Sequence, residues 1–300
     1  MSRSLVLTER DHELLGSLLE YRYLSTSQVQ RLHFPSSQTA ARRLRLLAED
    51  GYITTFRTMA CQDRIATLSR LGAAAIEERT GVQADSKGTN GNRQKPKDYL
   101  FLQHFLAITD FRITLAQACA RHPNLKLLDF IPEYESRPSP SGAYHKYVRD
   151  TVSDKIDRRT ITHAPDGVFA LEYDGRSALF FLEIDRGTEV VSNPEKGFLK
   201  MLRFYLTYLR DGGYQRYQRD FGVEKSFKAF RALVVTTSRT RLENMRAAAG
   251  RLSFDPAHAK RFIWLSSMDV VLDPEILTSS WIPSDPTEKE LYRLLPASLA

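Results

Sequence analysis

Three carboxylates lie at the ends of two apolar runs in APDGVFALEYDGRSALFFLEIDRGTE, residues 164–189. Asp166 comes just before the first run, and Glu183 and Asp185 close the second. Carboxylate oxygens suit Mg²⁺ or Mn²⁺, and a metal held by them orients water and neutralises the leaving oxygen in phosphodiester cleavage. These residue types therefore indicate a metal-dependent DNA endonuclease or nickase site, provided that the fold brings them together.

The dipeptide Asp174-Gly175 between the two runs predicts a β-hairpin. With the turn centred there, Phe169 faces Phe180, and Asp166 faces Glu183 with Cβ atoms roughly 5 Å apart. The turn therefore predicts that two of the three acids lie directly opposite each other.

Asp185 stands two residues beyond Glu183 and so shares its face of the strand. Like charges this close are destabilising. Three remedies exist: one acid stays protonated, a basic side chain intervenes, or a divalent cation binds between the acids. We expect the cation, with Asp166, Glu183 and Asp185 as metal ligands. The alternative is that Asp166 and Asp185 end their strands in solvent.

The surrounding elements predict a mixed sheet with helices on its faces. A helix of about twenty residues follows residue 98, and a strand over 125–134 precedes the hairpin. After it come a helix over 195–210, a continuous apolar strand over 230–238, a helix from 239 and a strand over 261–267. We expect an extended loop over 144–160, and the C-terminal tail over 269–300 fits no element.

The motif Pro165-Asp166 followed by Glu183-Ile184-Asp185 resembles the PD-(D/E)XK nuclease signature, and the αβββαβ order is similar to that fold. The resemblance implies a restriction-endonuclease-like domain over 99–268. Asp185 stands where the family usually has lysine, and some members recruit a lysine from the following helix. There Lys196, Lys200 and Arg203 form one stripe, and Lys200 is the candidate, giving a catalytic set of Asp166, Glu183, Asp185 and Lys200. Asp110 is a further candidate ligand, and His163 is interpreted as structural.

The first third of the chain has the order of a winged helix-turn-helix domain. Helices are predicted after Thr8, after Ser25 or Thr26, and from Pro35 to Gly51. Two short strands, YITTFRT and DRIATL, and a helix ending at Gly81 follow. We therefore place this domain at 1–82. A linker at 83–98, rich in Gly, Asn and Lys, separates it from the second domain.

The third helix has an apolar stripe of Ala40, Ala41, Leu44, Leu47 and Ala48, and its opposite face is basic. Residues 1–97 hold 15 Lys and Arg against 10 Asp and Glu, and so most of the net charge of +7. Both features indicate double-stranded DNA as the partner. The expected DNA-binding residues are Ser37, Gln38, Thr39, Arg42, Arg43, Arg45, Arg57 and Arg64. A solvated face or a protein-binding winged helix are the alternatives. Leu46 points away from the stripe and hints at a homodimer or a neighbouring protein.

The composition indicates a cytoplasmic protein that does not enter a membrane. The two cysteines, Cys61 and Cys119, match no metal or disulfide pattern, and no apolar run approaches eighteen residues.

The whole chain also resembles the replication-relaxation family. The resemblance rests on LTERDHELL, TAARRLRLLAEDGYI and LSRLGAAAIEERTG, then on APDGVFAL and FFLEIDRGTE. It implies a role in plasmid or mobile-element replication or DNA relaxation, with other replication or mobilisation proteins as partners.

Three functions are consistent with these residues. The first is a DNA-binding protein with a Mg²⁺- or Mn²⁺-dependent endonuclease or nickase domain. The second is a replication accessory or transcriptional regulator that uses a degenerate nuclease fold as a platform. The third is covalent relaxation through a tyrosine among Tyr205, Tyr208, Tyr214 and Tyr217; the lack of any His-x-His motif speaks against it.

Overall fold

The computed structural model describes residues 5–58, 61–81, 99–139, 142–154, 159–188, 190–193, 195–251 and 261–295. The chain divides into two compact units, Met1–Ile113 and Thr114–Ala300. The division falls inside helix α6 (Tyr99–Ala120). The linker predicted at 83–98 lies outside the described residues, so its boundaries stay a prediction. No helix in the described ranges is long and apolar enough to cross a membrane.

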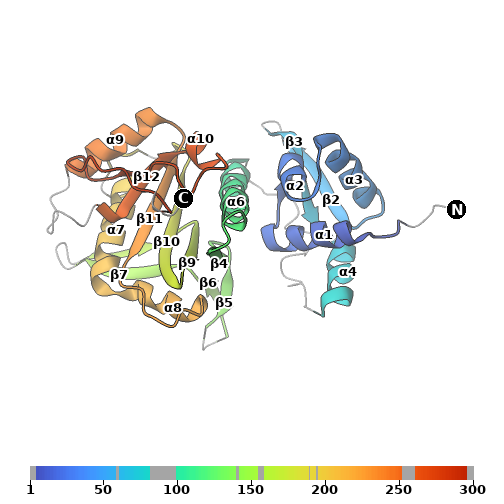
Figure 1. Cartoon of the computed structure of the whole chain (residues 1–300), viewed down its shortest axis with the longest axis horizontal. Coiled ribbons are helices and arrows are strands. Elements are labelled where there is room, and N and C mark those ends of the chain that lie inside the picture. Colours follow the sequence, from blue (N-terminus) through green and yellow to red (C-terminus); the bar gives the residue numbers. More distant parts are fainter. Residues whose placement is uncertain are drawn as a thin grey trace. The chain divides into compact units, whose positions relative to one another are not determined.

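The first unit has the element order predicted for residues 1–82 (Figure 1). Three helices are followed by a hairpin and a fourth helix. A short additional strand, β1, pairs with β3, and the antiparallel sheet therefore has the order β1-β3-β2. The elements are α1 (Glu9–Tyr21), β1 (Leu24–Ser25), α2 (Thr26–His33), α3 (Ser37–Glu49), β2 (Ile53–Thr58), β3 (Cys61–Leu68) and α4 (Arg70–Thr80).

Side-chain caps and a small apolar core hold these helices. The Ser25 side chain accepts a hydrogen bond from the backbone N–H of Gln28, and Ser36 does the same for Thr39, which starts α2 and α3 where the sequence predicts. Leu44 and Leu47 of α3 are buried with leucines of α1. Ala41, predicted to lie on the same apolar stripe, is exposed instead.

A buried ion pair joins α1 to α3. The carboxylate of Asp11 is 1% exposed and accepts hydrogen bonds from the backbone and hydroxyl of Thr8, both at 2.6 Å. Arg43 reaches it from α3 with Nε at 2.5 Å and with its second guanidinium nitrogen. Burial alone would raise the pKa of Asp11, but the hydrogen bonds from Arg43 and Thr8 outweigh it and lower the pKa below 3.8.

The second unit is built on a six-stranded mixed sheet of order β13-β12-β11-β10-β9-β4. Strand β11 pairs in parallel with both β10 and β12, whereas the pairs β10–β9, β9–β4 and β12–β13 are antiparallel. The strands are β4 (Leu125–Pro132), β9 (Gly167–Tyr173), β10 (Arg176–Asp185), β11 (Phe230–Thr236), β12 (Ile263–Ser267) and β13 (Ile282–Pro283). This is the mixed α+β architecture that the sequence predicts.

Two helices, α7 (Gly197–Asp211) and α9 (Arg239–Gly250), lie on the same face of this sheet (Figure 1). Phe181 of β10 packs against Tyr205 and Tyr208 of α7 with ring centroids 5.6 and 5.8 Å apart. Shorter elements complete the unit: η1 (Gly213–Arg216), α8 (Tyr217–Asp220) and α10 (Met268–Val271). The helices therefore cover the face that carries Glu183 and Asp185 at its edge.

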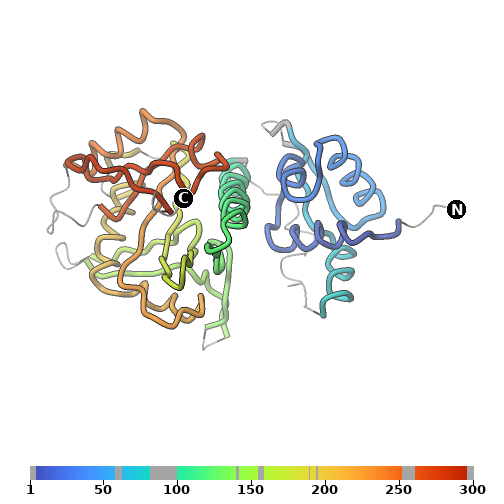
Figure 2. Tube along the Cα trace, in the orientation of Figure 1, coloured from blue at the N-terminus to red at the C-terminus, as the bar shows by residue number. Residues whose placement is uncertain are grey.

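Residues 144–160 do not form the extended loop that we predicted. They contribute to two hairpins, β5 (Ser136–Pro138) with β6 (Tyr144–Lys146), and β7 (Asp150–Asp154) with β8 (Arg159–His163). The C-terminal stretch, predicted as a tail, belongs to the second unit, and its trace runs back over that unit (Figure 2). It contributes β13, and the side chains of Leu277, Trp281 and Leu295 are at most 2% exposed.

Arg43→Ala is expected to lower the free energy of unfolding by about 3 kcal/mol, because it leaves the buried carboxylate of Asp11 without its cation. Because the pKa of Asp11 is lower in the folded state, the ionised carboxylate stabilises the fold. This stabilisation is present above the unfolded-state pKa of 3.8 and is lost as the pH falls through the lower folded-state pKa. Urea denaturation at pH 7 and at decreasing acidic pH measures both effects. Arg45→Ala, on an exposed side chain of the same helix, is the control and should change stability by less than about 0.5 kcal/mol. Equal losses in the two variants would contradict the role of the pair.

Candidate functional site

A hollow of about 530 Å³ in the first unit gathers most of the residues predicted to bind DNA. Helix α3 contributes its first two turns, and the β2–β3 hairpin contributes the opposite wall. The lining residues are Thr26, Ser37, Gln38, Ala41, Arg42, Leu44, Arg45, Arg57, Asp63 and Arg64. Six of the eight predicted residues therefore meet around one concave surface; Thr39 and Arg43 do not line it.

The charge of this hollow is predominantly positive. Four arginines line it, and Asp63, the one acid among the lining residues, accepts hydrogen bonds from the backbone and hydroxyl of Ser27. Arg64 donates to the hydroxyl of Thr55 at 3.1 Å. Arg45 lies 3.7 Å from Glu49, but both side chains are more than half exposed, so this pair is weak. The hollow can therefore attract a polyanion.

Arg43 and Thr39 have other partners. The guanidinium of Arg43 is bound to Asp11, so its prediction as a DNA-binding residue is corrected: it stabilises the fold. The Thr39 hydroxyl lies 2.9 Å from that of Ser36 at the start of α3. Both side chains turn away from the hollow because successive residues of a helix point about 100° apart.

In the second unit the predicted hairpin register is confirmed. Asp174 and Gly175 have φ angles of 46° and 72°, as the two central residues of a type I′ turn require. Phe180 pairs with Phe169, and the last paired residues are Leu182 and Gly167. The pairing ends one residue before Asp166 and Glu183, so their direct opposition stays a prediction.

Asp166 turns its carboxylate toward the backbone of the partner strand. Its Oδ2 accepts a hydrogen bond from the N–H of Ile184 at 2.6 Å, and its own N–H donates to the carbonyl of Leu182 at 3.0 Å. The residue is 8% exposed. The hairpin thus fixes Asp166 beside Glu183.

Two side chains form hydrogen bonds with the carboxylate of Glu183. His163 Nε2, at the end of β8, lies 2.6 Å from Glu183 Oε1, and the hydroxyl of Tyr205 donates to the same oxygen at 2.5 Å. Burial raises the pKa of Glu183, and His163 partly offsets this effect. Burial would lower the pKa of His163, but the charges of Glu183 and Asp166 outweigh it and raise the pKa above 6.5. The interpretation of His163 as a purely structural residue is therefore incomplete, because it neutralises a predicted site residue.

Asp185 is separated from the other two carboxylates by its partner. Arg241 of α9 binds it through two nitrogens, with one distance of 2.8 Å, and Thr236 donates its hydroxyl at 2.8 Å. Among the described residues, no group of three or more His, Cys, Asp or Glu could hold a metal. The three-carboxylate pocket that we predicted is therefore corrected: basic side chains balance the charges of Glu183 and Asp185.

Of the other candidates, Lys200 acts on the cluster through its charge and Asp110 does not belong to it. The charge of Lys200 lowers the pKa of His163, although Glu183 and Asp166 make the net shift upward. Arg203, on the same helix stripe, pairs instead with the buried Asp154 at 3.1 Å. Asp110 belongs to the first unit, where Arg31 binds it at 2.9 Å. The acidic cluster, as we call it here, consists of His163, Asp166, Glu183, Lys200 and Tyr205.

Four tyrosines considered as covalent nucleophiles are buried and engaged. The hydroxyl of Tyr205 binds Glu183, that of Tyr208 binds Asp150, and that of Tyr214 donates to the carbonyl of Lys228. Burial raises the pKa of each, and also that of Tyr217. Neutral, buried phenols are poor nucleophiles, which speaks against tyrosine chemistry.

The sequence model described as replication-relaxation matches residues 15–223. The chain belongs to the replication-relaxation family. No curated protein matches it. One solved structure, of the restriction endonuclease FokI bound to DNA, resembles it at 10% sequence identity and a TM-score of 0.27; the match covers 89% of this chain and 45% of that one. The chain thus spans less than half of that protein, and a score this low carries no argument about fold or function.

In this member of the replication-relaxation family, two residues of the site escaped the sequence analysis. Tyr205 was predicted only as a possible covalent nucleophile and not as a partner of Glu183, and Arg241 was not predicted at all. Arg241 lies 56 residues after its partner Asp185, so no local spacing connects them. The signal that could have identified Arg241 is the order of two apolar strands followed by a helix. If the strands pair in parallel, as β10 and β11 do, the start of α9 lies next to the end of β10.

Glu183→Gln is expected to lower the pKa of His163, because the substitution removes the carboxylate charge that raises it while the imidazole stays buried. A pH titration of the His163 Cε1–H signal by NMR in wild type and variant measures this change. Glu172→Gln, near the turn of the same hairpin, is the control and should leave the titration unchanged. A His163 pKa that is equal in wild type and Glu183→Gln would contradict the contact.

Proposed function

We propose that the chain binds double-stranded DNA through its first unit, acting as a winged helix-turn-helix. The observation that carries this proposal is the concave surface on which Arg42, Arg45, Arg57 and Arg64 converge from a helix and a hairpin. Such a surface complements the convex phosphate backbone of DNA in charge and in curvature. A solvated basic face would not need to be concave or to draw on two elements.

Within this proposal the two walls of the hollow have different roles. Gln38 and Arg42, on the first turns of α3, are placed as recognition-helix residues are when they contact base edges in the major groove. Arg57 and Arg64, on the β2–β3 hairpin, contact phosphates, which positions the unit without reading sequence. Asp63 lies beside Ser27 and limits approach to the edge of the hollow.

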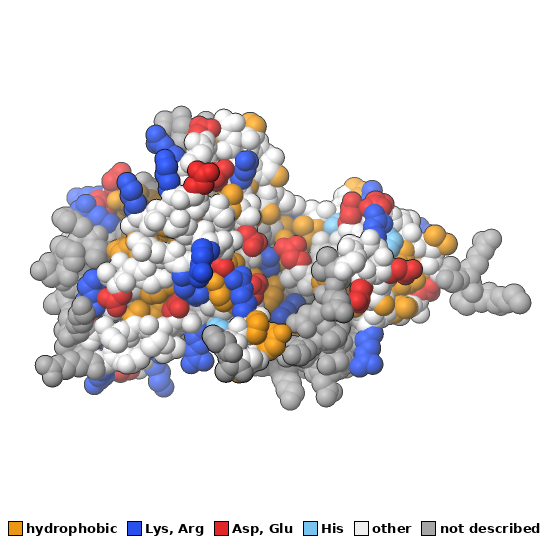
Figure 3. Space-filling view, turned by 90° about the horizontal axis from the view of Figure 1, so that it is seen from below, with side chains coloured by type: hydrophobic (Ala, Val, Ile, Leu, Met, Phe, Trp, Pro, Cys, Tyr) orange, Lys and Arg blue, Asp and Glu red, His pale blue; other side chains and the backbone are white. Residues whose placement is uncertain are grey.

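We place this binding in plasmid or mobile-element replication or DNA relaxation, on the strength of the family match. The second unit carries a nearly neutral balance, and on the face seen in Figure 3 the basic and acidic side chains of the larger part are interspersed. This balance favours the first unit as the main contributor to DNA affinity.

Arg42→Ala and Arg57→Ala are each expected to weaken DNA binding by about 1–3 kcal/mol, that is, by about 5- to 150-fold. Arg57→Ala should weaken all duplexes alike and reduce the slope of log K against log salt by about 1, whereas Arg42→Ala should also relax sequence preference. Fluorescence anisotropy with random and selected duplexes at several salt concentrations measures both. Arg79→Ala, on α4 away from the hollow, is the control. Affinity that falls equally in the control, or not at all in the hollow variants, would sink the proposal.

A second candidate function is metal-dependent hydrolysis of a phosphodiester at the acidic cluster. The observation that favours it is that the hairpin end holds Asp166 bonded to the backbone beside Glu183, and Glu183 bonded to His163. Lys200, whose charge acts on His163, is the lysine that the nuclease signature calls for. Asp185 is excluded as a ligand because Arg241 occupies both its oxygens.

The two remaining carboxylates, Asp166 and Glu183, fit a Mg²⁺ ion that is also bound by the substrate. This ion is commonly bound through one or two carboxylates together with substrate phosphates. Asp166 and Glu183 would supply two carboxylates. His163 and Tyr205 both bind Oε1 of Glu183, so Oε2 is the oxygen that would bind the ion. When bound, the ion would activate water and stabilise the leaving oxygen. His163 and Tyr205 orient Glu183, and the ammonium of Lys200 would neutralise charge on the phosphate.

Wild-type protein with Mg²⁺ or Mn²⁺ is expected to nick or linearise supercoiled plasmid, and Glu183→Ala should reduce the rate by at least about 100-fold. Gel analysis over time measures this, with Glu172→Gln as the matched control. Because the metal ligands include the substrate, calorimetry without DNA should detect no tight Mg²⁺ site. Plasmid left intact by every protein would refute hydrolysis and support a non-catalytic platform, and closed relaxed circles would support tyrosine chemistry.

A further inference from the structure

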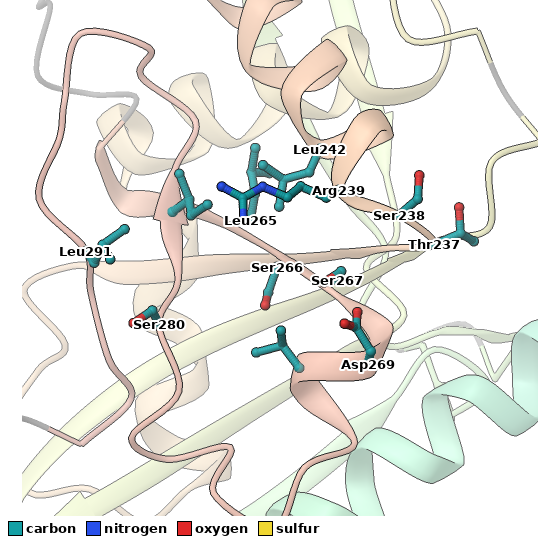
Figure 4. A pocket seen from close by; sticks show the side chains of 12 residues that line it. Thr237, Ser238, Arg239, Leu242, Leu265, Ser266, Ser267, Asp269, Ser280 and Leu291 are labelled. Atoms are coloured by element: carbon teal, nitrogen blue, oxygen red, sulfur yellow. The ribbon is translucent and has the colours of Figure 1, made fainter.

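A pocket of about 640 Å³ opens in the second unit at the carboxyl ends of β11 and β12 (Figure 4). It is large enough for a ligand of the size of a mononucleotide. In parallel sheets this edge is the usual place for ligands. The lining residues are Thr237, Ser238, Arg239, Leu242, Leu265, Ser266, Ser267, Asp269, Val270, Ser280, Ile282 and Leu291.

One part of the pocket favours an anion. Helix α9 begins here, with Ser238 as its cap and no acidic residue in its first turn. The N–H groups of a first turn have no acceptor within the helix, and they carry the positive end of the helix dipole. The side chain of Arg239 extends along the pocket between Leu242 and Leu265 (Figure 4). A helix N-terminus with an arginine beside it is suited to a phosphate group.

A second, independent observation points to a ligand with polar atoms. Ser266 is 3% exposed, yet its hydroxyl lines the pocket and has no side-chain hydrogen bond among the described residues. The hydroxyl is open to the pocket and is not sealed in the core, so a ligand atom there can bond to it without displacing a protein partner. Ser280 lines the same part of the pocket.

The remaining walls are apolar, with one carboxylate. Leu265, Ile282 and Leu291 line the pocket, and Leu291 is 55% exposed, an apolar surface that a flat ring could cover. Asp269, the one acid among the lining residues, accepts a hydrogen bond from Ser267, which lowers its pKa. As a charged acceptor it can bind a hydroxyl or amino group but repels an anion, so the anionic end of a ligand must lie at Arg239.

We propose that this pocket binds a nucleoside phosphate, with its phosphate at the start of α9 and Arg239. The sugar and base then face Ser266, Asp269 and the apolar wall. Inorganic phosphate alone would leave the Ser266 hydroxyl and the apolar wall uncovered. The nucleoside phosphate comes either from a free nucleotide or from the end of a DNA strand. This proposal does not depend on DNA binding by the first unit.

Isothermal titration calorimetry of the full chain with 2′-deoxyadenosine 5′-monophosphate tests the proposal, with deoxyadenosine and inorganic phosphate as partial ligands. Arg239→Ala should weaken binding about tenfold, and Ser266→Ala about threefold. Arg251→Ala, at the opposite end of α9, is the matched control and should bind like wild type. Both partial ligands should bind at least about tenfold more weakly than the nucleotide.

A 5′-phosphorylated ten-nucleotide single strand distinguishes the two sources. It is titrated into an Arg42→Ala, Arg57→Ala background, so that the hollow of the first unit contributes little. Tighter binding of the strand than of the nucleotide, lost in Arg239→Ala, assigns the pocket to a strand end; the reverse order assigns it to a free nucleotide. The proposal is overturned if neither probe binds saturably, or if binding is the same in Arg239→Ala and Ser266→Ala as in wild type.

Discussion

A carboxylate that is buried on folding needs a counter-charge. Within each unit, the packing of helices and strands depends on which residue supplies that charge. Asp11 is neutralised by Arg43, Asp185 by Arg241 and Glu183 by His163. In each pair the two residues belong to different elements. Removing one partner from such a pair leaves a buried charge, which is strongly destabilising. The ion pairs therefore fix how α3 meets α1 and how α9 meets β10.

The same constraint sorts the basic residues into those that stabilise the fold and those that can bind a ligand. Arg42, Arg43 and Arg45 are close in sequence, but the helix turns each by about 100° from the last. Arg43 consequently reaches Asp11, while Arg42 and Arg45 face the hollow. Counting basic residues on a helix overestimates its DNA-binding charge when one of them satisfies a buried acid.

Local sequence signals were sufficient for the long helices, for the central strands of the sheet and for one register. The Asp174-Gly175 turn defines the hairpin because few other dipeptides adopt two successive positive φ angles, and the pairing of Phe169 with Phe180 follows from it. Apolar runs in the sequence predicted the central strands of the sheet. The C-terminal segment was missed because Leu277, Trp281 and Leu295 are buried singly, without the periodicity of a helix or strand.

Partners far apart in sequence could not be predicted in this way. The hairpins β5–β6 and β7–β8 are anchored by contacts such as that of Asp150 with Tyr208 and Arg216, 58 and 66 residues later. Short polar strands of this kind have a weak local signal, and their stability comes from such distant contacts. The identity of the cation beside each acid likewise depended on the tertiary fold.

The nature of its counter-charge distinguishes Glu183 from Asp185. Arg241 is a permanent cation that binds Asp185 through two nitrogens, so this acid and its partner form a closed pair where the signature has lysine. Glu183 has a histidine as its partner, and an imidazole can give up its proton near neutral pH. Lys200 forms no ion pair with any described residue. The charge beside Glu183 can therefore change with pH, whereas that beside Asp185 stays fixed.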